Sequence, residues 1–175
     1  MEWNCEVIDL AEYADDAVAV QAHAFGLADD EIAVRQRIMR RHAEFAGVRS
    51  LGAFDADHTL IGFGYGYPNL KDQWWSLVIE PHLARNGHRG WLDDAFVVGE
   101  LHVLPGAQGH GIGLTLISML CKGQERDRVL LSALDEQTPA RRLYRGLGFD
   151  DLARPVLFPG NDRPYTVMGA TLPFA

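Results

Sequence analysis

Hydrophobic and polar residues alternate with two different periods, and the first part of the chain predicts one strand followed by two helices. Residues 2–10 alternate with the period of two that is typical of a strand, here an edge strand. Residues 10–25 repeat their apolar side chains at helical spacing instead. A second helix is expected over residues 31–46, with Asp29 or Asp30 as its N-cap.

The next part of the chain predicts a β-hairpin and then a segment with no clear period. Residues 48–68 predict two short strands about the polar turn at residues 55–58, with alternating Phe and Tyr in the second strand, which Pro68 ends. Residues 69–94 follow neither period and contain Trp74, Trp75 and Trp91. Because long irregular segments are usually functional, we expect a functional loop here.

The last part of the chain predicts a strand, helix, strand unit and then further short elements. The strands "DAFVVGELHVLP" and "DRVLLSALD" flank a glycine-rich turn and a helix, an order that implies parallel neighbours. A short helix should follow, with Thr138 as N-cap and Gly146 or Gly148 at its end. Two final strands are expected near residues 151–158 and 164–171. The predicted fold is an α/β domain with a mixed sheet.

Composition narrows the class of protein. A chain of 175 residues, 47% hydrophobic and 23% charged, suits one globular domain over residues 1–175. Cys5 and Cys121 are too few for a disulfide framework, and we expect a cytoplasmic protein with Cys121 in its core. No apolar run reaches the roughly 18 residues of a membrane helix. The net charge of −8 argues against nonspecific binding of nucleic acid.

The stretch "VLPGAQGHGIGLTLISML" combines four glycines with the start of an apolar helix. Glycines 109, 111 and 113 let the backbone approach an anion, and the helix start directs free N–H groups at it. A phosphate or pyrophosphate is the natural ligand. An ATP-binding P-loop would need a Lys where Ile112 follows Gly111, and the dinucleotide fingerprint needs a different glycine spacing. A tight turn that binds nothing is the structural alternative.

Two motifs resemble the GNAT superfamily of acyl-CoA-dependent N-acetyltransferases. The first is V-x-P-x-x-[QR]-G-x-G-[IA]-G, matched by Val103, Pro105, Gln108, Gly109, Gly111, Ile112 and Gly113. The second is A-x-x-L-Y-x-x-x-G-F, matched about thirty residues later by Ala140, Leu143, Tyr144, Gly148 and Phe149. The resemblance covers about residues 94–149. It implies one GNAT-like domain whose mixed, mostly antiparallel sheet has a central parallel pair splayed around CoA, with helices on both faces.

The resemblance also implies a set of residues that bind acetyl-CoA as co-substrate, with no metal. The glycine turn would hold the CoA phosphates through Gln108, Gly109, His110, Gly111, Ile112, Gly113, Leu114 and Thr115. Backbone groups of Leu101, His102 and Val103 would lie along the pantetheine arm. Gln137 occupies the place of an Asn that contacts this arm in many members. Arg142, with Arg141 beside it, would approach the 3′-phosphate.

The chemistry of amide formation requires an acid for the thiolate and a base for the ammonium. Tyr144 occupies the position of the family's general acid, and its alternative role is a packed aromatic. The family's base position on the central strand falls on Val97 or Gly99, neither of which can titrate. Glu100 is the first candidate for the base and His102 the second. Both should face away from Val103 on a regular strand unless a bulge changes the alternation.

The acceptor is expected to be a small-molecule amine. By the resemblance, residues 11–46 and 69–94 build its site, and the three tryptophans named above form either an aromatic wall or a structural plug. Asp93 and Asp94 either attract a cationic amine or are merely solvated. The alternative function is a catalytically silent acyl-CoA sensor, and either is compatible with a homodimer. A nucleotide-binding protein that uses the glycine turn for ATP or NAD is a third reading, and CoA would not stabilise it.

Overall fold

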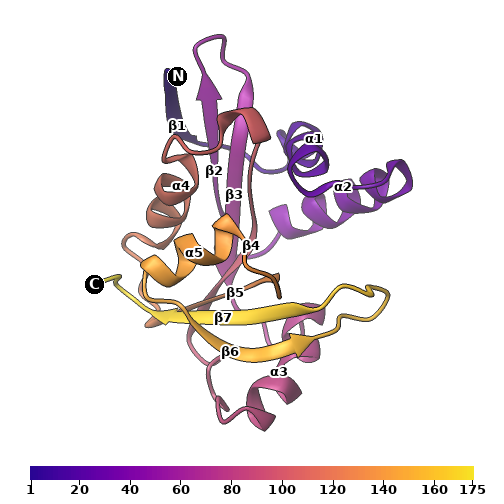
Figure 1. Cartoon of the computed structure of the whole chain (residues 1–175), viewed down its shortest axis with the longest axis vertical. Coiled ribbons are helices and arrows are strands. Elements are labelled where there is room, and N and C mark those ends of the chain that lie inside the picture. The colour runs from indigo at the N-terminus through magenta and orange to yellow at the C-terminus, as the bar shows by residue number, and fades with distance from the viewer. The chain divides into compact units, whose positions relative to one another are not determined.

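The computed structural model describes residues 1–175 and contains seven strands in the hydrogen-bonded order β1-β2-β3-β4-β5-β7-β6 (Figure 1). The chain divides into two compact units. Unit 1 comprises residues 1–67 and 98–120, and unit 2 comprises residues 68–97 and 121–175. Strand β4 (Ala95–Val103) contributes residues to each unit. The mixed α/β sheet predicted from the sequence is confirmed.

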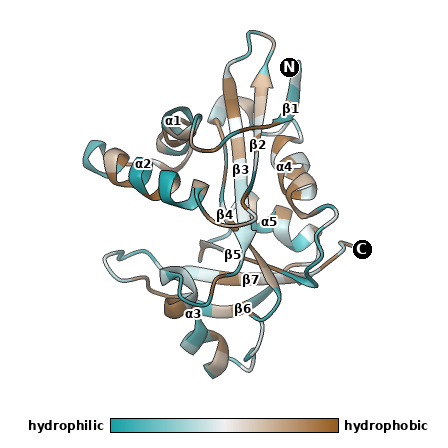
Figure 2. Ribbon diagram, turned by 180° about the vertical axis from the view of Figure 1, so that it is seen from behind, coloured by the Kyte–Doolittle hydropathy of each residue, from teal (hydrophilic) through white to brown (hydrophobic).

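Unit 1 is built on the antiparallel strands β1 (Trp3–Val7), β2 (Arg49–Asp55) and β3 (Leu60–Pro68), followed by residues 98–103 of β4. The predicted hairpin is present, with its turn at residues 56–59. Three helices belong to this unit: α1 (Ala14–Phe25), α2 (Asp29–Ala43) and α4 (Ile112–Cys121). In Figure 2 α2 is mainly teal, as expected for a helix whose outer face is charged.

The contacts of β3 show that α4 and α2 pack on opposite faces of the strands in unit 1. A Cβ added at Gly62 or Gly64 would contact side chains of Val103, Leu101 or α4. Tyr65, on the alternate face, hydrogen-bonds to α2. The glycines of β3 therefore make room for close packing of α4, and the Tyr65 and Tyr67 rings of β3 pack against His42 of α2.

Unit 2 contains the first residues of β4 together with β5 (Arg128–Leu134), β6 (Asp150–Val156) and β7 (Tyr165–Thr171). Residues 95–97 of β4 pair in parallel with residues 128–130 of β5, which confirms the predicted parallel pair. The other pairings in this unit are antiparallel. The pairing of β4 with β5 covers only the first three residues of each strand.

The prediction of an irregular segment over residues 69–94 was wrong, because this segment contains helix α3 (Trp74–Arg85). Apolar residues lie on both the buried and the exposed side of this helix and obscure its period, and Pro81 lies within it. Ile79 and Leu83 pack in the core of unit 2 against Leu130 and Val167. The segment is therefore mainly a structural part of unit 2.

Two details of the predicted helix starts also differ. Helix α1 begins at Ala14, and residues 10–13 form a turn. Asp29 and Asp30 do not cap α2, because Ala28 occupies the N-cap position and its N–H donates to the Glu31 carboxylate at 3.4 Å. The predicted cap of α5 (Pro139–Gly146) is confirmed, since the Thr138 side chain accepts from the N–H of Arg141. None of the helices is long and apolar enough to span a bilayer.

Candidate active site

Strand β4 presents a hydrogen-bonded acid and imidazole pair in unit 1. His102 Nε2 lies 2.6 Å from Glu100 Oε2. The other carboxylate oxygen, Oε1, lies 3.8 Å from Arg35 Nη1 on α2. The His102 ring contacts Phe25 of α1 and Phe63 of β3 at centroid distances of 5.9 and 5.7 Å. The two base candidates are therefore neighbours, and aromatic packing fixes the imidazole.

The face that Glu100 presents depends on an irregularity in β4. A Cβ added at Gly99 would lie 2.7 Å from Tyr65 Cε2, on the face that also holds Glu100 and His102. Gly99 and Glu100 thus turn toward the same face in succession, as residues of a β-bulge do. Because the Tyr65 ring fills the space over Gly99, no side chain fits there. The titratable groups of this strand are displaced to positions 100 and 102.

Glu100 of this pair and two groups near it, Tyr65 and His42, have shifted pKa values. Burial raises the pKa of Tyr65 well above its ordinary value, so the phenol stays protonated. Burial lowers the pKa of His42 on α2 to about 4, and its Nδ1 lies 2.8 Å from the Tyr65 hydroxyl. Burial alone would raise the pKa of Glu100, but the hydrogen bond and charge of His102 and the charge of Arg35 give a net lowering. At neutral pH the carboxylate is ionised and His42 is neutral.

A methyl group at Gly99 is expected to destabilise the protein. In Gly99→Ala the new Cβ meets the Tyr65 ring, which is 1% exposed and held by His42, so the ring cannot swing away. We expect a loss of about 1–3 kcal/mol in the free energy of unfolding, measured by urea denaturation. Gly146→Ala is the control, since its Cβ meets no atom within 4 Å and should not destabilise. Equal stability of the two variants would contradict the packing described.

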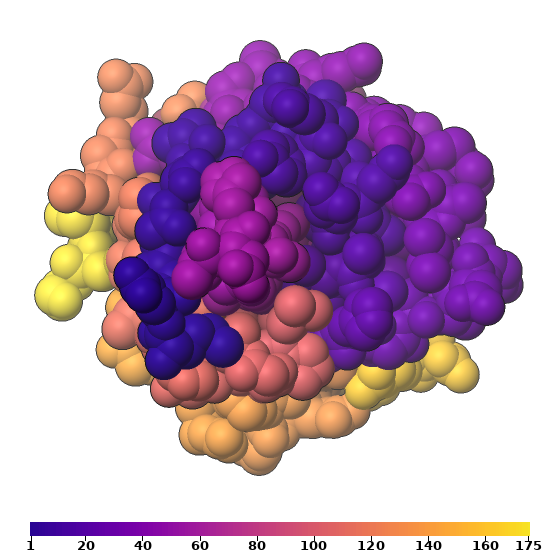
Figure 3. Space-filling view, turned by 90° about the horizontal axis from the view of Figure 1, so that it is seen from above, coloured from indigo at the N-terminus to yellow at the C-terminus, as the bar shows by residue number.

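The glycine turn follows β4 in unit 1 and leads into α4. Gly109 and Gly111 both have φ of +81°, a conformation that favours glycine. The first backbone N–H to enter the pattern of α4 is that of Thr115, which donates to the Gly111 carbonyl at 3.0 Å. The N–H groups of residues 109–114 make no hydrogen bond within the protein and are available to an anion. Figure 3 shows this turn in salmon at the surface, beside the magenta tip of the hairpin.

The side chains of the turn differ in their hydrogen bonds and in their burial. Gln108 Nε2 donates to the Val103 carbonyl at 3.1 Å, so one of the backbone groups expected along the pantetheine arm already accepts a hydrogen bond. The His110 ring lies against the carbonyls of Ala107 and Gln108. Ile112 is buried, whereas Leu114 is exposed. The side chains of Gln108 and His110 therefore contact backbone carbonyls of the turn, while the amides of residues 109–114 stay free.

Helix α5 of unit 2 contains the second motif. Tyr144 is 6% exposed and its ring packs on Phe149 at a centroid distance of 5.5 Å. Gln137 and Arg142 are exposed. Arg141 is only 1% exposed and its guanidinium binds both carboxylate oxygens of Asp151. The expectation that Arg141 approaches a CoA phosphate is therefore wrong, and Arg142 alone remains for that role.

Unit 2 also places the tryptophans expected on the acceptor side. Trp75 and Trp91 pack against the core of unit 2, and Trp91 covers Gly169 of β7. The Arg128 guanidinium lies 4.8 Å from the centre of the Trp91 ring. Trp74 is 56% exposed. The structural role thus applies to two of the three rings.

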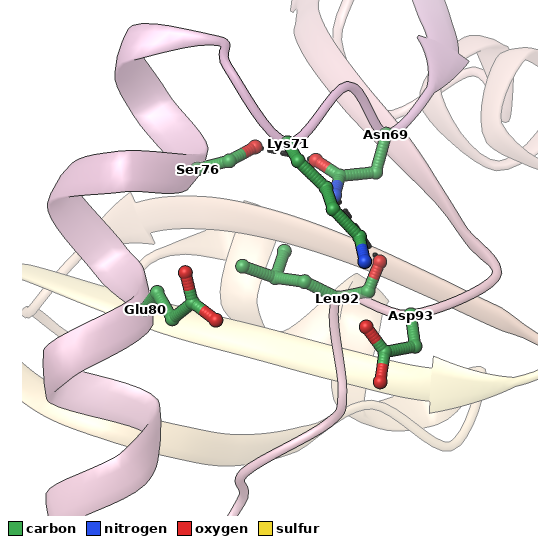
Figure 4. A pocket seen from close by; sticks show the side chains of 6 residues that line it. All are labelled: Asn69, Lys71, Ser76, Glu80, Leu92 and Asp93. Atoms are coloured by element: carbon green, nitrogen blue, oxygen red, sulfur yellow. Dashed lines mark hydrogen bonds between the residues drawn. The ribbon is translucent and has the colours of Figure 1, made fainter.

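A small polar pocket in unit 2 includes Asp93 (Figure 4). Its volume is about 70 Å³, well below the size of sites for drug-sized ligands. Asn69 Nδ2 donates to the Leu92 carbonyl at 3.1 Å, and the Ser76 hydroxyl donates to Asn69 Oδ1. The carboxylates of Glu80 and Asp93 also line it. The hydrogen bonds tie α3 to the loop before β4, and nothing in the pocket matches a CoA site. No group of three His, Cys, Asp or Glu side chains is placed to hold a metal ion.

Comparison with known proteins identifies the family. A model described as the acetyltransferase (GNAT) family matches residues 13–149. The chain is 39% identical over 122 residues to the GCN5-like protein acetyltransferase of Mycobacterium tuberculosis, covering 65% of this chain and 59% of that protein. It is 37% identical over 112 residues to the mycothiol acetyltransferase of Frankia casuarinae, covering 61% of this chain and 29% of that protein. The chain therefore spans less than two thirds of the length of either relative.

A solved structure agrees with these matches in fold. The ribosomal-protein-S18-alanine N-acetyltransferase of Escherichia coli superposes with a TM-score of 0.69 at 13% identity, covering 99% of this chain and 96% of that chain. The chain belongs to the GNAT acetyltransferase family.

Proposed function

We propose that this protein is an N-acetyltransferase that transfers the acetyl group of acetyl-CoA directly to a primary amine within a ternary complex. The observation that supports enzyme activity best is the Glu100–His102 pair on β4, in the same unit as the glycine turn. A silent CoA sensor has no need of an oriented imidazole. We further propose that residues 1–175 act as one acetyltransferase domain in the cytoplasm.

The pair favours a division of roles between base and orienting group. Glu100 accepts the Nε2 hydrogen of His102, which leaves Nδ1 as the imidazole atom that can accept a proton. The lowered pKa of Glu100 makes its carboxylate a weak base but a good orienting anion. We propose that His102 takes the proton from the ammonium and that Glu100 fixes its tautomer, as carboxylates do for histidines in hydrolase triads.

Co-substrate binding and leaving-group protonation follow from the two motifs. The free amides of residues 109–114 would bind the CoA phosphates, with Thr115 and Gln108 flanking them. Backbone groups of Leu101 and Val103 would pair with the pantetheine arm. Tyr144 is proposed as the acid, because a phenol of pKa about 10 can protonate a thiolate whose conjugate acid has a pKa near 8.5.

The acceptor has two candidate classes. A small-molecule amine remains the prediction from the sequence. The 39% identity to a protein acetyltransferase favours an amine on a protein as the second candidate. A panel of small primary amines and lysine-containing peptides, assayed for CoA release, separates the two.

The ligand class is tested first by thermal unfolding with acetyl-CoA, CoA, ATP or NAD added separately. A ligand at a hundred times its dissociation constant stabilises the folded state by about 2.7 kcal/mol, or roughly 5–10 °C for a chain of this length. We expect this shift with acetyl-CoA and CoA only. Stabilisation by ATP or NAD without CoA would overturn the proposed function.

A further inference from the structure

Helix α5 is anchored by a buried ionic network that the sequence did not reveal. Arg141 Nη2 lies 3.1 and 2.9 Å from the two carboxylate oxygens of Asp151 on β6, and Nη1 donates to the Glu136 carbonyl at 3.2 Å. Asp135, at the end of β5, lies 3.8 Å from the same guanidinium. Arg141 thus contacts two segments of unit 2, the residues after β5 and strand β6.

Asp135 and Asp151 each make further hydrogen bonds or ion pairs besides those with Arg141. Asp135 accepts from the Thr166 hydroxyl at 2.7 Å and pairs with Arg154 at 2.7 Å. Asp151 also pairs with Arg145 at 3.0 Å, and its charged partners hold the pKa of its carboxyl below the ordinary value despite burial. The network joins α5 to β5, β6 and β7. It does not depend on a single exposed ion pair.

The anchor lies one helical turn from the proposed acid. Residues three apart share a helix face, so Arg141 and Tyr144 lie on the same side of α5, and both are buried. Helix α5 has only eight residues, too few for a helix to be stable on its own. Its position therefore depends on what its side chains bind. At the Arg141 turn these are the two aspartates, and at the Tyr144 turn the ring of Phe149.

We propose that Arg141 is a positioning residue for Tyr144, which it holds at the location where its hydroxyl protonates the departing thiolate. This inference rests on the proposed function. A general acid must lie within hydrogen-bond reach of the atom it protonates, and a displacement of about 1 Å can cost 100-fold in rate. The guanidinium is held at two separate nitrogens, Nη2 on the Asp151 carboxylate and Nη1 on the Glu136 carbonyl, which fixes it in both distance and direction. The single ammonium of a lysine cannot make both contacts in this way.

A double-mutant cycle on kcat tests this positioning role. Arg141→Gln is expected to lower kcat about 10- to 100-fold while the KM for acetyl-CoA stays within about twofold. In a Tyr144→Phe background, where the acid is already absent, the same substitution should change kcat by no more than about twofold. Arg141→Lys should fall between Arg141→Gln and the unmodified protein. A purely structural role would lower kcat equally in both backgrounds.

Controls separate the anchor from folding and from the proposed function. Arg163→Gln removes an exposed pair with Glu136 and should leave kcat unchanged. If Arg141→Gln does not fold, Asp151→Asn weakens the same anchor with Arg141 in place and should show the same cycle. Hydrogen exchange of the α5 amides should accelerate in either variant and not in Arg163→Gln.

The outcomes are distinguishable. Equal losses in both Tyr144 backgrounds, or unchanged α5 exchange, would overturn the positioning role alone. If Tyr144→Phe leaves kcat unchanged, the acid assignment fails and this inference fails with it, while CoA release by the unmodified protein would still support the proposed function. A chain that acetylates no amine would overturn both.

Discussion

Replacing His102 with glutamine is expected to lower kcat about 10²- to 10⁴-fold, the usual contribution of a positioned general base. We propose the imidazole as the proton acceptor on β4, because the lowered pKa of Glu100 makes its carboxylate a weak base and Glu100 orients the ring through the Nε2 hydrogen bond. Binding of CoA should be nearly unchanged, since only the backbone of His102 is expected along the pantetheine arm. Steady-state CoA release with a saturating amine measures the effect.

Substitution of Glu100, the hydrogen-bond partner of His102, tests the proposed division of roles. Glu100→Gln should lower kcat less than His102→Gln, and the double variant should be no slower than His102→Gln alone, because the two side chains act as one unit. His58→Gln in the exposed turn of the hairpin, outside the segments expected to bind the amine, is the matched control and should leave kcat unchanged. Independent, multiplying losses from Glu100 and His102 would rule out the division of roles proposed for them.

The parts of the site that the sequence predicted are those in which local chemistry determines structure. A strand, a glycine turn and a helix start were all readable around Gly109 and Gly111, and both glycines adopt the positive φ that the turn requires. Thr138 and Pro139 likewise predicted the start of α5. These features depend on neighbours within a few residues, so a single sequence contains the information.

The parts that were missed depend on contacts between distant residues. Period-two alternation could not show that Gly99 and Glu100 face the same side, because this depends on the ring of Tyr65, more than thirty residues earlier. Arg141 was indistinguishable in sequence from Arg142, yet one is buried on Asp151 and the other is exposed. Helix α3 was missed because Trp74 and Leu77, on its exposed side, are apolar as well.

The neutral His42 predicts a loss of stability in mild acid. Burial lowers its pKa in the folded state to about 4, against 6.5 in the unfolded chain, so folding favours the neutral imidazole. The resulting stability is complete above pH 6.5 and is lost as the pH falls toward 4. A shift of this size corresponds to a loss on the order of 3 kcal/mol across that range. The lowered pKa of Glu100 adds a separate loss, which begins only below its ordinary value of 4.5.

Urea unfolding at pH 7, 6 and 5, followed by tryptophan fluorescence, measures the contribution of His42. The unmodified protein should lose up to about 1.4 kcal/mol per pH unit from this residue, and His42→Gln should show a correspondingly flatter profile. The variant will be less stable at pH 7 because it loses ring contacts with Tyr65, Tyr67 and Phe45, so the slope rather than the absolute value is decisive. His23→Gln should keep the original slope. Parallel profiles for His42→Gln and the unmodified protein would mean that the imidazole can be protonated without unfolding, and that the packing around His42 is looser than these contacts imply.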